Sequence, residues 1–190
     1  MISKLQNPKT KSYGELKFLL SGKDFPWFYI DKSTENDVYE VKESESYNLS
    51  FLSHAFLTRP GEVNLYPTHN SSHLNLASKV VCEIFKYNNI DVNCIYRINA
   101  NMVFPSPSRG IKVSRPHRDH CFDHKNLLIY FTNAGGKTIV EDVSKRKDSS
   151  YSLSLSHNPK EDDIIVFEGV MHCHEIPQEK RRLVLVVTYI

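Results

Sequence analysis

Alternation of apolar and polar residues is the clearest regular pattern in the second half of the chain. It runs from residue 92 to residue 104, and shorter alternating or apolar runs follow at residues 126–133, 137–143, 151–156, 163–168 and 182–189. Successive side chains of a strand point to opposite faces, so a period of two predicts a series of short β-strands. The chain is therefore expected to be mostly β.

A helical pattern occupies residues 71–90. Its apolar residues recur every three or four positions, at Leu74, Ala77, Val80, Val81, Ile84 and Phe85. This spacing places them on one face of a helix, and Ser71 or Ser72 is a candidate N-cap. We expect this helix to pack against the outside of a sheet.

The first seventy residues carry weaker signals. Aromatic and β-branched residues at 25–30 favour an edge strand, with Pro26 near its start. Residues 31–50 are polar and acidic, which predicts a loop with at most a short strand at Val38–Val41. Residues 51–70 are interpreted as turns.

Length and composition limit the possible classes of protein. A chain of 190 residues can form one domain, and 40% hydrophobic with 11% aromatic residues is typical of a globular protein. The formal charge of +2 gives no reason to expect general binding to nucleic acids or membranes, and we find neither a signal peptide nor a membrane span. The four cysteines lack disulfide-framework spacing, which favours a reducing compartment such as the cytoplasm.

Candidate metal ligands stand at two distant places in the sequence. His117 and Asp119 are two residues apart, so in an extended strand both side chains point to one face. His172 could supply a third ligand, and His174 is the alternative. Two imidazoles and one carboxylate on one side of an ion form the facial triad of non-haem iron(II) oxygenases.

The order of the surrounding motifs is more specific than the histidines alone. The His-Arg-Asp motif is followed by the apolar run 126–133, the glycine pair 135–136, the run 163–169, and then His172, Pro177 and Arg182. This series resembles the 2-oxoglutarate and iron(II)-dependent oxygenases, particularly their small prolyl-4-hydroxylase-like members, including phage-type ones. The resemblance covers a motif-bearing core of about residues 92–190.

The resemblance implies a fold, cofactors and a reaction. The fold would be a double-stranded β-helix, or jelly roll, with at least one buttressing helix, and residues 1–190 would form a single domain. His117, Asp119 and His172 would hold iron(II). The enzyme would use oxygen to couple the decarboxylation of 2-oxoglutarate to succinate with hydroxylation of a substrate. In such relatives a proline and an arginine follow the third ligand at the spacing of Pro177 and Arg182, which favours His172.

The same resemblance suggests residues that bind the cosubstrate. Arg182 would grip the distal carboxylate of 2-oxoglutarate through its planar fork, whereas Arg181 should point the other way. Asn101 is a further candidate, although the polar face of its strand could instead meet solvent. Relatives carry a tyrosine where this chain has Phe131. The possible replacements are Tyr130, Tyr96 and Thr138.

Several alternatives concern substrate and activity. By analogy with relatives, the expected substrate is a peptidyl or free amino-acid side chain. The loop 105–116 could act as a lid, and its cations allow a nucleic-acid substrate, but it lacks aromatic residues for base stacking. The Phe131 departure would suit a metal-binding module without catalysis. The segments 120–124 and 172–174, which mix histidine and cysteine, also permit a structural zinc site.

Overall fold

The computed structural model of the protein describes residues 1–31, 46–47, 49–61, 65–105, 113–146 and 152–190. Its helices are α1 (Lys11–Ser21), α2 (Leu74–Tyr87) and the short 3-10 turn η1 (Val143–Lys145). Its strands are β1 (Ile2–Leu5), β2 (Phe28–Ile30), β3 (Ser46–Tyr47), β4 (Phe51–Thr58), β5 (Thr68–His69), β6 (Ile95–Val103), β7 (Val113–Ser114), β8 (Lys125–Tyr130), β9 (Thr138–Glu141), β10 (Leu153–His157), β11 (Ile164–Glu168), β12 (His172–His174) and β13 (Arg182–Tyr189).

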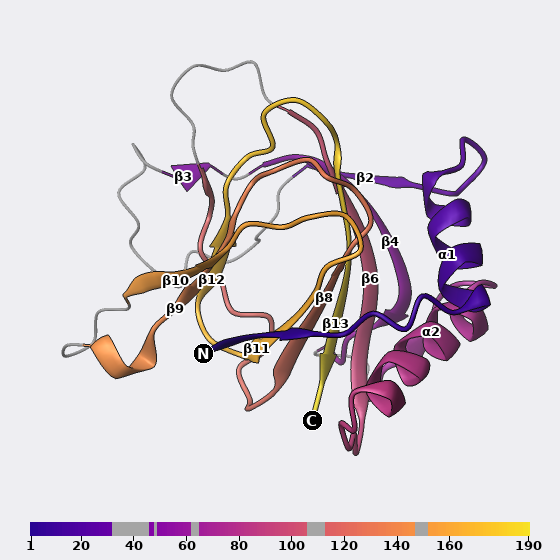
Figure 1. The fold of residues 1–190 in the computed structure, drawn as a ribbon, viewed down its shortest axis with the longest axis horizontal. Helices are drawn as coiled ribbons and strands as arrows, with labels where there is room; N and C mark the ends of the chain where they lie inside the picture. Colours follow the sequence, from indigo (N-terminus) through magenta and orange to yellow (C-terminus); the bar gives the residue numbers. More distant parts are fainter. Residues whose placement is uncertain (32–45, 48, 62–64, 106–112, 147–151) are drawn as a thin grey trace.

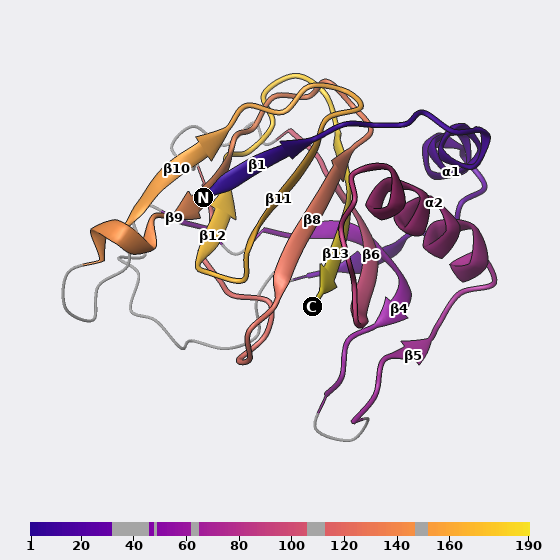
Figure 2. The ribbon, with the colours of Figure 1, turned by 60° about the horizontal axis from the view of Figure 1, so that its bottom comes forward.

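The strands form a large sheet and a smaller one that face each other (Figures 1 and 2). The large sheet has the order β1-β11-β8-β13-β6-β4-β2, with β5 paired to β4, and its neighbours are antiparallel. The smaller sheet has the order β10-β9-β12, and β3 and β7 form a separate parallel pair. This is a double-stranded β-helix, so the predicted fold class is confirmed.

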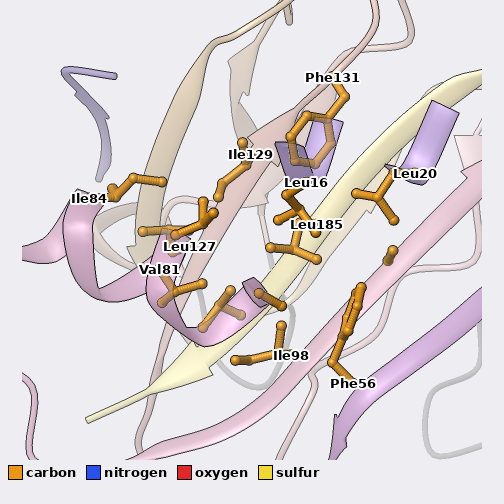
Figure 3. Close-up of a cluster of buried hydrophobic side chains, with 14 of the residues drawn as sticks. Leu16, Leu20, Phe56, Val81, Ile84, Ile98, Leu127, Ile129, Phe131 and Leu185 are labelled. Carbon is orange, nitrogen blue, oxygen red and sulfur yellow. The ribbon is translucent and has the colours of Figure 1, made fainter. Parts of the chain in front are cut away.

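Both helices cover the outer face of the large sheet, as Figure 2 shows. The apolar stripe of α2 packs into the main core, where Ala77, Val81 and Ile84 have no exposed surface. Figure 3 shows Ile98 and Leu185 reaching this core from the sheet. The helical pattern was therefore interpreted correctly. The expected cap was wrong, because the helix is capped by His73 and has no side-chain cap bond.

Helix α1 was not predicted, although the sequence contains an N-cap residue and apolar residues at helical spacing. The Thr10 hydroxyl accepts a hydrogen bond from the backbone of Tyr13, as an N-cap should. Tyr13, Leu16 and Leu20 recur at helical spacing and are buried in the main core. Within the apolar run 16–20, Leu16 and Leu20 face the core, whereas Phe18 is exposed. Strand β1, which pairs with β11, was also unpredicted.

Interpreting residues 51–70 as turns was wrong for their first half. Strand β4 pairs with β6 in the large sheet, and Phe56 is fully buried there. His54 broke the apolar pattern that would have predicted this strand. It is a buried residue with two hydrogen bonds, to the Pro26 carbonyl at 2.8 Å and to the Ser71 hydroxyl at 2.7 Å.

The other predicted strands are present, and their two faces are distinct. On β13 and β8, residues such as Leu183 and Leu127 turn towards the helices, whereas Val184 and Leu128 belong to a second cluster between the sheets. The edge strand β2 lies at the end of the large sheet.

The suggested strand at Val38–Val41 and most of the suggested lid lie outside the described residues. Within the described part of the chain, no helix is long and apolar enough to cross a membrane.

Candidate active site

A cavity of about 1090 Å³ lies on the inner face of the large sheet. Both sheets contribute side chains to its wall, including Asn101, Thr138, His172, Arg182 and Val184. His117 and Asp119 also line it, from the segment that leads from β7 to β8. The polar face of β6 therefore faces this cavity in part, through Arg97 and Asn101.

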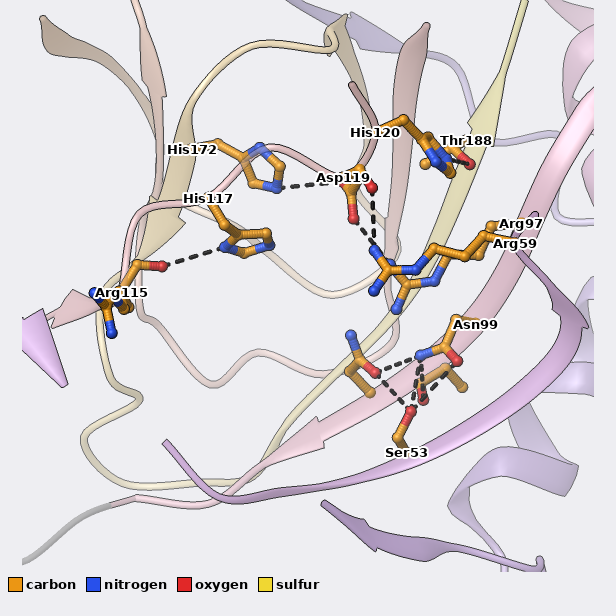
Figure 4. A network of polar contacts seen from close by, with 12 residues as sticks. Ser53, Arg59, Arg97, Asn99, Arg115, His117, Asp119, His120, His172 and Thr188 are labelled. Atoms are coloured by element: carbon orange, nitrogen blue, oxygen red, sulfur yellow. Dashed lines mark hydrogen bonds and ion pairs between the residues drawn. The ribbon is translucent and has the colours of Figure 1, made fainter. Parts of the chain in front are cut away.

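The backbone brings two of the candidate ligands together. His117 and His172 form an antiparallel bridge in which each backbone N–H donates to the carbonyl of the other, at 3.0 and 2.9 Å. Their rings lie 4.5 Å apart between centroids. With Asp119 they form a group in which all three ligand atoms lie within 4.8 Å of one another (Figure 4).

Hydrogen bonds to the backbone orient both imidazole rings. The Nδ1 atom of His172 lies 2.9 Å from the Val170 carbonyl, and that of His117 lies 3.2 Å from the Arg115 carbonyl. A carbonyl only accepts, so each Nδ1 carries the proton and each Nε2 keeps a free lone pair. Such bonds fix the tautomer and ring angle of metal-ligating histidines. Burial lowers the pKa of His172 to about 4, so this imidazole is neutral at pH 7.

Asp119 completes the group as a buried carboxylate. Its Oδ1 accepts a hydrogen bond from Arg97 at 2.8 Å. Its Oδ2 is buried, accepts no hydrogen bond from the described residues, and lies 3.5 Å from Nε2 of His172. Burial alone would raise the pKa of Asp119, but His172 and Arg97 outweigh that effect and hold it well below its usual range. An unsatisfied carboxylate oxygen between two imidazole lone pairs fits a divalent cation.

A buried cation lies elsewhere on the cavity wall. Arg182 is 5% exposed, and its Nη2 donates to the Thr138 hydroxyl at 3.1 Å. The same hydroxyl lies 2.6 Å from that of Tyr130, whose ring centroid is 5.3 Å from the guanidinium carbon. Nε of Arg182 is buried without a hydrogen-bond partner in the described part of the protein, and no carboxylate there pairs with it. A buried, unpaired arginine of this kind fits a carboxylate ligand.

Solved structures of an oxygenase-family oxidoreductase, a prolyl hydroxylase and an alpha ketoglutarate dependent epimerase have a similar fold. An oxidoreductase of the 2OG-Fe(II) oxygenase family from Burkholderia pseudomallei matches with a TM-score of 0.63 and 12% identity, over 99% of this chain and 84% of that one. A prolyl hydroxylase from Trichoplax adhaerens, in complex with a hypoxia inducible factor peptide fragment, matches with a TM-score of 0.53 and 11% identity, over 100% and 83%. The non-heme alpha ketoglutarate dependent epimerase SnoN from nogalamycin biosynthesis matches with a TM-score of 0.57 and 9% identity, over 100% and 78%.

The chain has the 2-oxoglutarate and iron(II)-dependent oxygenase fold. No protein-family model matches the sequence, and no curated protein matches it significantly. The assignment of the oxygenase fold therefore rests on architecture, together with the convergence of the His-Arg-Asp motif and His172.

The two candidates for the third ligand lie in different surroundings. His172 belongs to the converging group, whereas His174 does not. Burial lowers the pKa of His174 to about 3, and its Nδ1 lies 2.9 Å from the Glu175 carbonyl. The zinc alternative also lacks a site, since the triad is the one converging set of histidine, cysteine and acidic ligands found among the described residues.

Phe131 does not stand where the oxygenase resemblance expected a cosubstrate residue. It belongs to the main core and stacks on Tyr13 at 5.6 Å. Tyr130, one residue earlier, turns to the other face of β8 and contacts Arg182 and Thr138. Tyr96 lies apart from that group, 4.9 Å from the ring of Phe122.

Asn101 lines the cavity within a cluster of amides and a hydroxyl. Its Oδ1 accepts hydrogen bonds from Ser53 at 3.1 Å and from Asn99 at 2.5 Å. The polar face of this strand therefore does not simply meet solvent, because Asn99 is buried and Asn101 faces the cavity.

Sequence reasoning missed two arginines beside the triad. Arg97 binds Asp119 through its carboxylate, and Arg59 donates to the Asp119 backbone carbonyl at 3.0 Å. A signal existed for Arg97, since it lies on the polar face of the strand predicted at 92–104, together with Asn101. Arg59 follows β4, which was not predicted, so nothing in the sequence placed it here.

Proposed function

We propose that the protein is an iron(II)- and 2-oxoglutarate-dependent dioxygenase that hydroxylates its substrate. The observation that carries this proposal is the pairing of a converging two-histidine, one-carboxylate group with a buried, unpaired arginine on the wall of the same cavity. Neither feature stabilises the protein by itself, because each leaves polar atoms buried without partners. Ligands of the right charge would satisfy both.

In this proposal His117, Asp119 and His172 hold iron(II) through their Nε2 atoms and Oδ2. Two imidazoles and one carboxylate would supply the protein ligands of such a site, and the cosubstrate and oxygen would need its remaining positions. Bound iron would supply the redox chemistry that couples decarboxylation of 2-oxoglutarate to hydroxylation. The hydrogen bonds from the imidazoles to the Val170 and Arg115 carbonyls keep the rings aimed at the ion.

We further propose that Arg182 binds the distal carboxylate of 2-oxoglutarate with help from the Thr138 and Tyr130 hydroxyls. The strand register supports this role. Thr138 pairs with His174 and Val140 pairs with His172, so Thr138 lies two residues along β9 from the level of the third ligand. Two residues of a strand span about 7 Å, which suits an extended five-carbon dicarboxylate. Asn101 would add a hydrogen bond through Nδ2, which has no acceptor among the described residues.

For the substrate, we propose a peptidyl or free amino-acid side chain. One structure with this fold is a prolyl hydroxylase bound to a peptide. The alternative of a metal-binding module without catalysis rested on Phe131, and that argument weakens because Tyr130 supplies a hydroxyl beside Arg182. We also treat residues 1–190 as one domain, since both helices and the large sheet share one core.

The test is an anaerobic titration of metal-free protein with iron(II) and then 2-oxoglutarate, followed by visible absorbance. The chelate should give a weak charge-transfer band, and no primary substrate is needed. His117→Ala should abolish the band because it removes a ligand, whereas His174→Ala should retain it. If the wild-type protein bound iron and 2-oxoglutarate without the band, or bound neither, the proposed function would be wrong.

A further inference from the structure

The charge on the cavity wall is strongly one-sided. The chain as a whole is nearly balanced, with 24 lysines and arginines against 22 acidic residues. The charged side chains that line the cavity are Arg59, Arg97, Arg115, Arg118 and Arg182 on one side, and Asp119 alone among the described acids on the other. Positive charge in a low-dielectric cavity attracts anions more strongly than the same charge on an open surface.

Besides Arg115, which has an interaction of its own, two of these arginines already have other partners or roles. Arg182 serves the cosubstrate in the proposed function. Arg118 donates to the Gly169 carbonyl and pairs with Asp123 at 3.3 Å, near the surface. Neither residue explains why two further guanidinium groups lie next to the metal ligand.

Arg59 and Arg97 converge on Asp119 from two different strands of the large sheet. Arg97 projects from β6 and donates to Oδ1 of Asp119, and Arg59 follows β4 and donates to the Asp119 backbone carbonyl (Figure 4). A guanidinium has five N–H donors, and the described residues accept from each of these two only once. Most of their donors therefore have no acceptor among the described residues.

Among the described residues, Arg97 pairs with the Asp119 carboxylate, whereas Arg59 contacts the Asp119 backbone carbonyl, so one negative charge faces two guanidinium groups. Burial lowers the pKa of the Arg97 guanidinium, Asp119 opposes that shift, and Arg59 lowers the pKa further by repulsion. The second oxygen of Asp119 faces His172 and belongs to the proposed metal position. Because the two negative charges of 2-oxoglutarate would offset those of iron(II), the loaded cavity would still carry excess positive charge.

We propose that Arg59 and Arg97 form a subsite for an anionic group of the primary substrate, either a carboxylate or a phosphate. The planar fork of arginine matches both groups with paired, charge-assisted hydrogen bonds. Bound there, the anion would hold the substrate beside the triad. The inference rests on the proposed function and narrows its substrate class to molecules that carry such a group.

The test is calorimetric titration of the anaerobic protein, loaded with iron(II) and saturating 2-oxoglutarate, with inorganic phosphate and separately with propionate. Saturation with 2-oxoglutarate occupies Arg182, so the remaining anion site is the one measured. Arg59→Gln should weaken anion binding about tenfold, because charge-assisted hydrogen bonds are lost. Arg59→Lys, which keeps the charge, should recover part of the affinity. Arg118→Gln is the matched control and should bind as the wild type does.

The outcomes separate this inference from the proposed function. Tighter binding of phosphate than of propionate would assign a phosphate-bearing substrate, and the reverse order a carboxylate. Absence of saturable anion binding in a protein that shows the charge-transfer band would overturn the subsite and leave the oxygenase proposal intact. Equal affinity in the wild type and Arg59→Gln would also overturn it. Anion binding that depends on Arg59 in a protein without the band would support the subsite and contradict the oxygenase proposal.

Discussion

Replacing Arg182 with methionine should have opposite effects on cosubstrate binding and on the stability of the free protein. The substitution removes the charge and keeps an unbranched side chain of similar reach. Loss of one partner from a buried, hydrogen-bonded charge pair costs about 2–5 kcal/mol. The affinity for 2-oxoglutarate should therefore fall roughly 30-fold to 5,000-fold.

The free protein should not lose stability, because Arg182 is buried without a carboxylate partner among the described residues. Its hydrogen bond to Thr138 and its contact with the Tyr130 ring contribute on the order of 1–2 kcal/mol each. The desolvation of an unpaired cation costs several kcal/mol, which is the larger effect. Arg182→Met should thus leave the free energy of unfolding unchanged or raise it by about 1–4 kcal/mol.

Thermal and urea unfolding with and without 2-oxoglutarate would measure both effects under anaerobic conditions with iron(II). A ligand present at about 100 times its dissociation constant stabilises the folded state by about 2.7 kcal/mol, and the variant should lose most of that gain. Arg181→Met is the matched control, since Arg181 is exposed and donates to the Ser21 carbonyl. A variant at position 182 that unfolds about 2 kcal/mol more easily yet binds 2-oxoglutarate normally would refute this reasoning.

Three further predictions concern neighbouring residues. His172→Ala should lose iron binding measured by metal analysis, while His174→Ala should keep it; the reverse result would exchange their roles. Tyr130→Phe removes one buried hydroxyl beside Arg182, so the dissociation constant for 2-oxoglutarate should rise about fivefold to tenfold in the anaerobic titration, and an unchanged value would remove Tyr130 from the site. Gly169→Ala would drive a methyl group into the His124 ring, so urea unfolding should show a loss of about 1–3 kcal/mol, and a smaller loss would mean that the ring moves aside.

Much of the sheet could be predicted because its strands have two chemically different faces. Along β13, Leu183 and Leu185 enter the main core and Val184 turns to the opposite side, so the sequence alternates visibly. Strand β4 could not be identified in this way, since His54 occupies a core position and is satisfied by hydrogen bonds rather than by apolar contact. Local pattern carries no information about a polar residue whose partners come from elsewhere in the chain.

The candidate site also contains residues that a local pattern predicts and residues that it does not. The spacing of His117 and Asp119 is a local signal, and it led directly to the converging group. The residue matched to the usual cosubstrate tyrosine was misleading, because a shift of one position in a strand exchanges the two faces and sends Phe131 into the core. Arg59 could not be found at all, because its place beside Asp119 depends on how β4 pairs with β6.

The bridge between His117 and His172 has a consequence for the order of events during synthesis. The two proposed ligands are joined by paired backbone hydrogen bonds although they are far apart in the sequence, and Arg182 on the same cavity wall comes later still. A nascent chain would therefore hold an incomplete set of the proposed ligands until its final strands have left the ribosome. Metal binding would therefore follow the folding of the barrel and would not nucleate it.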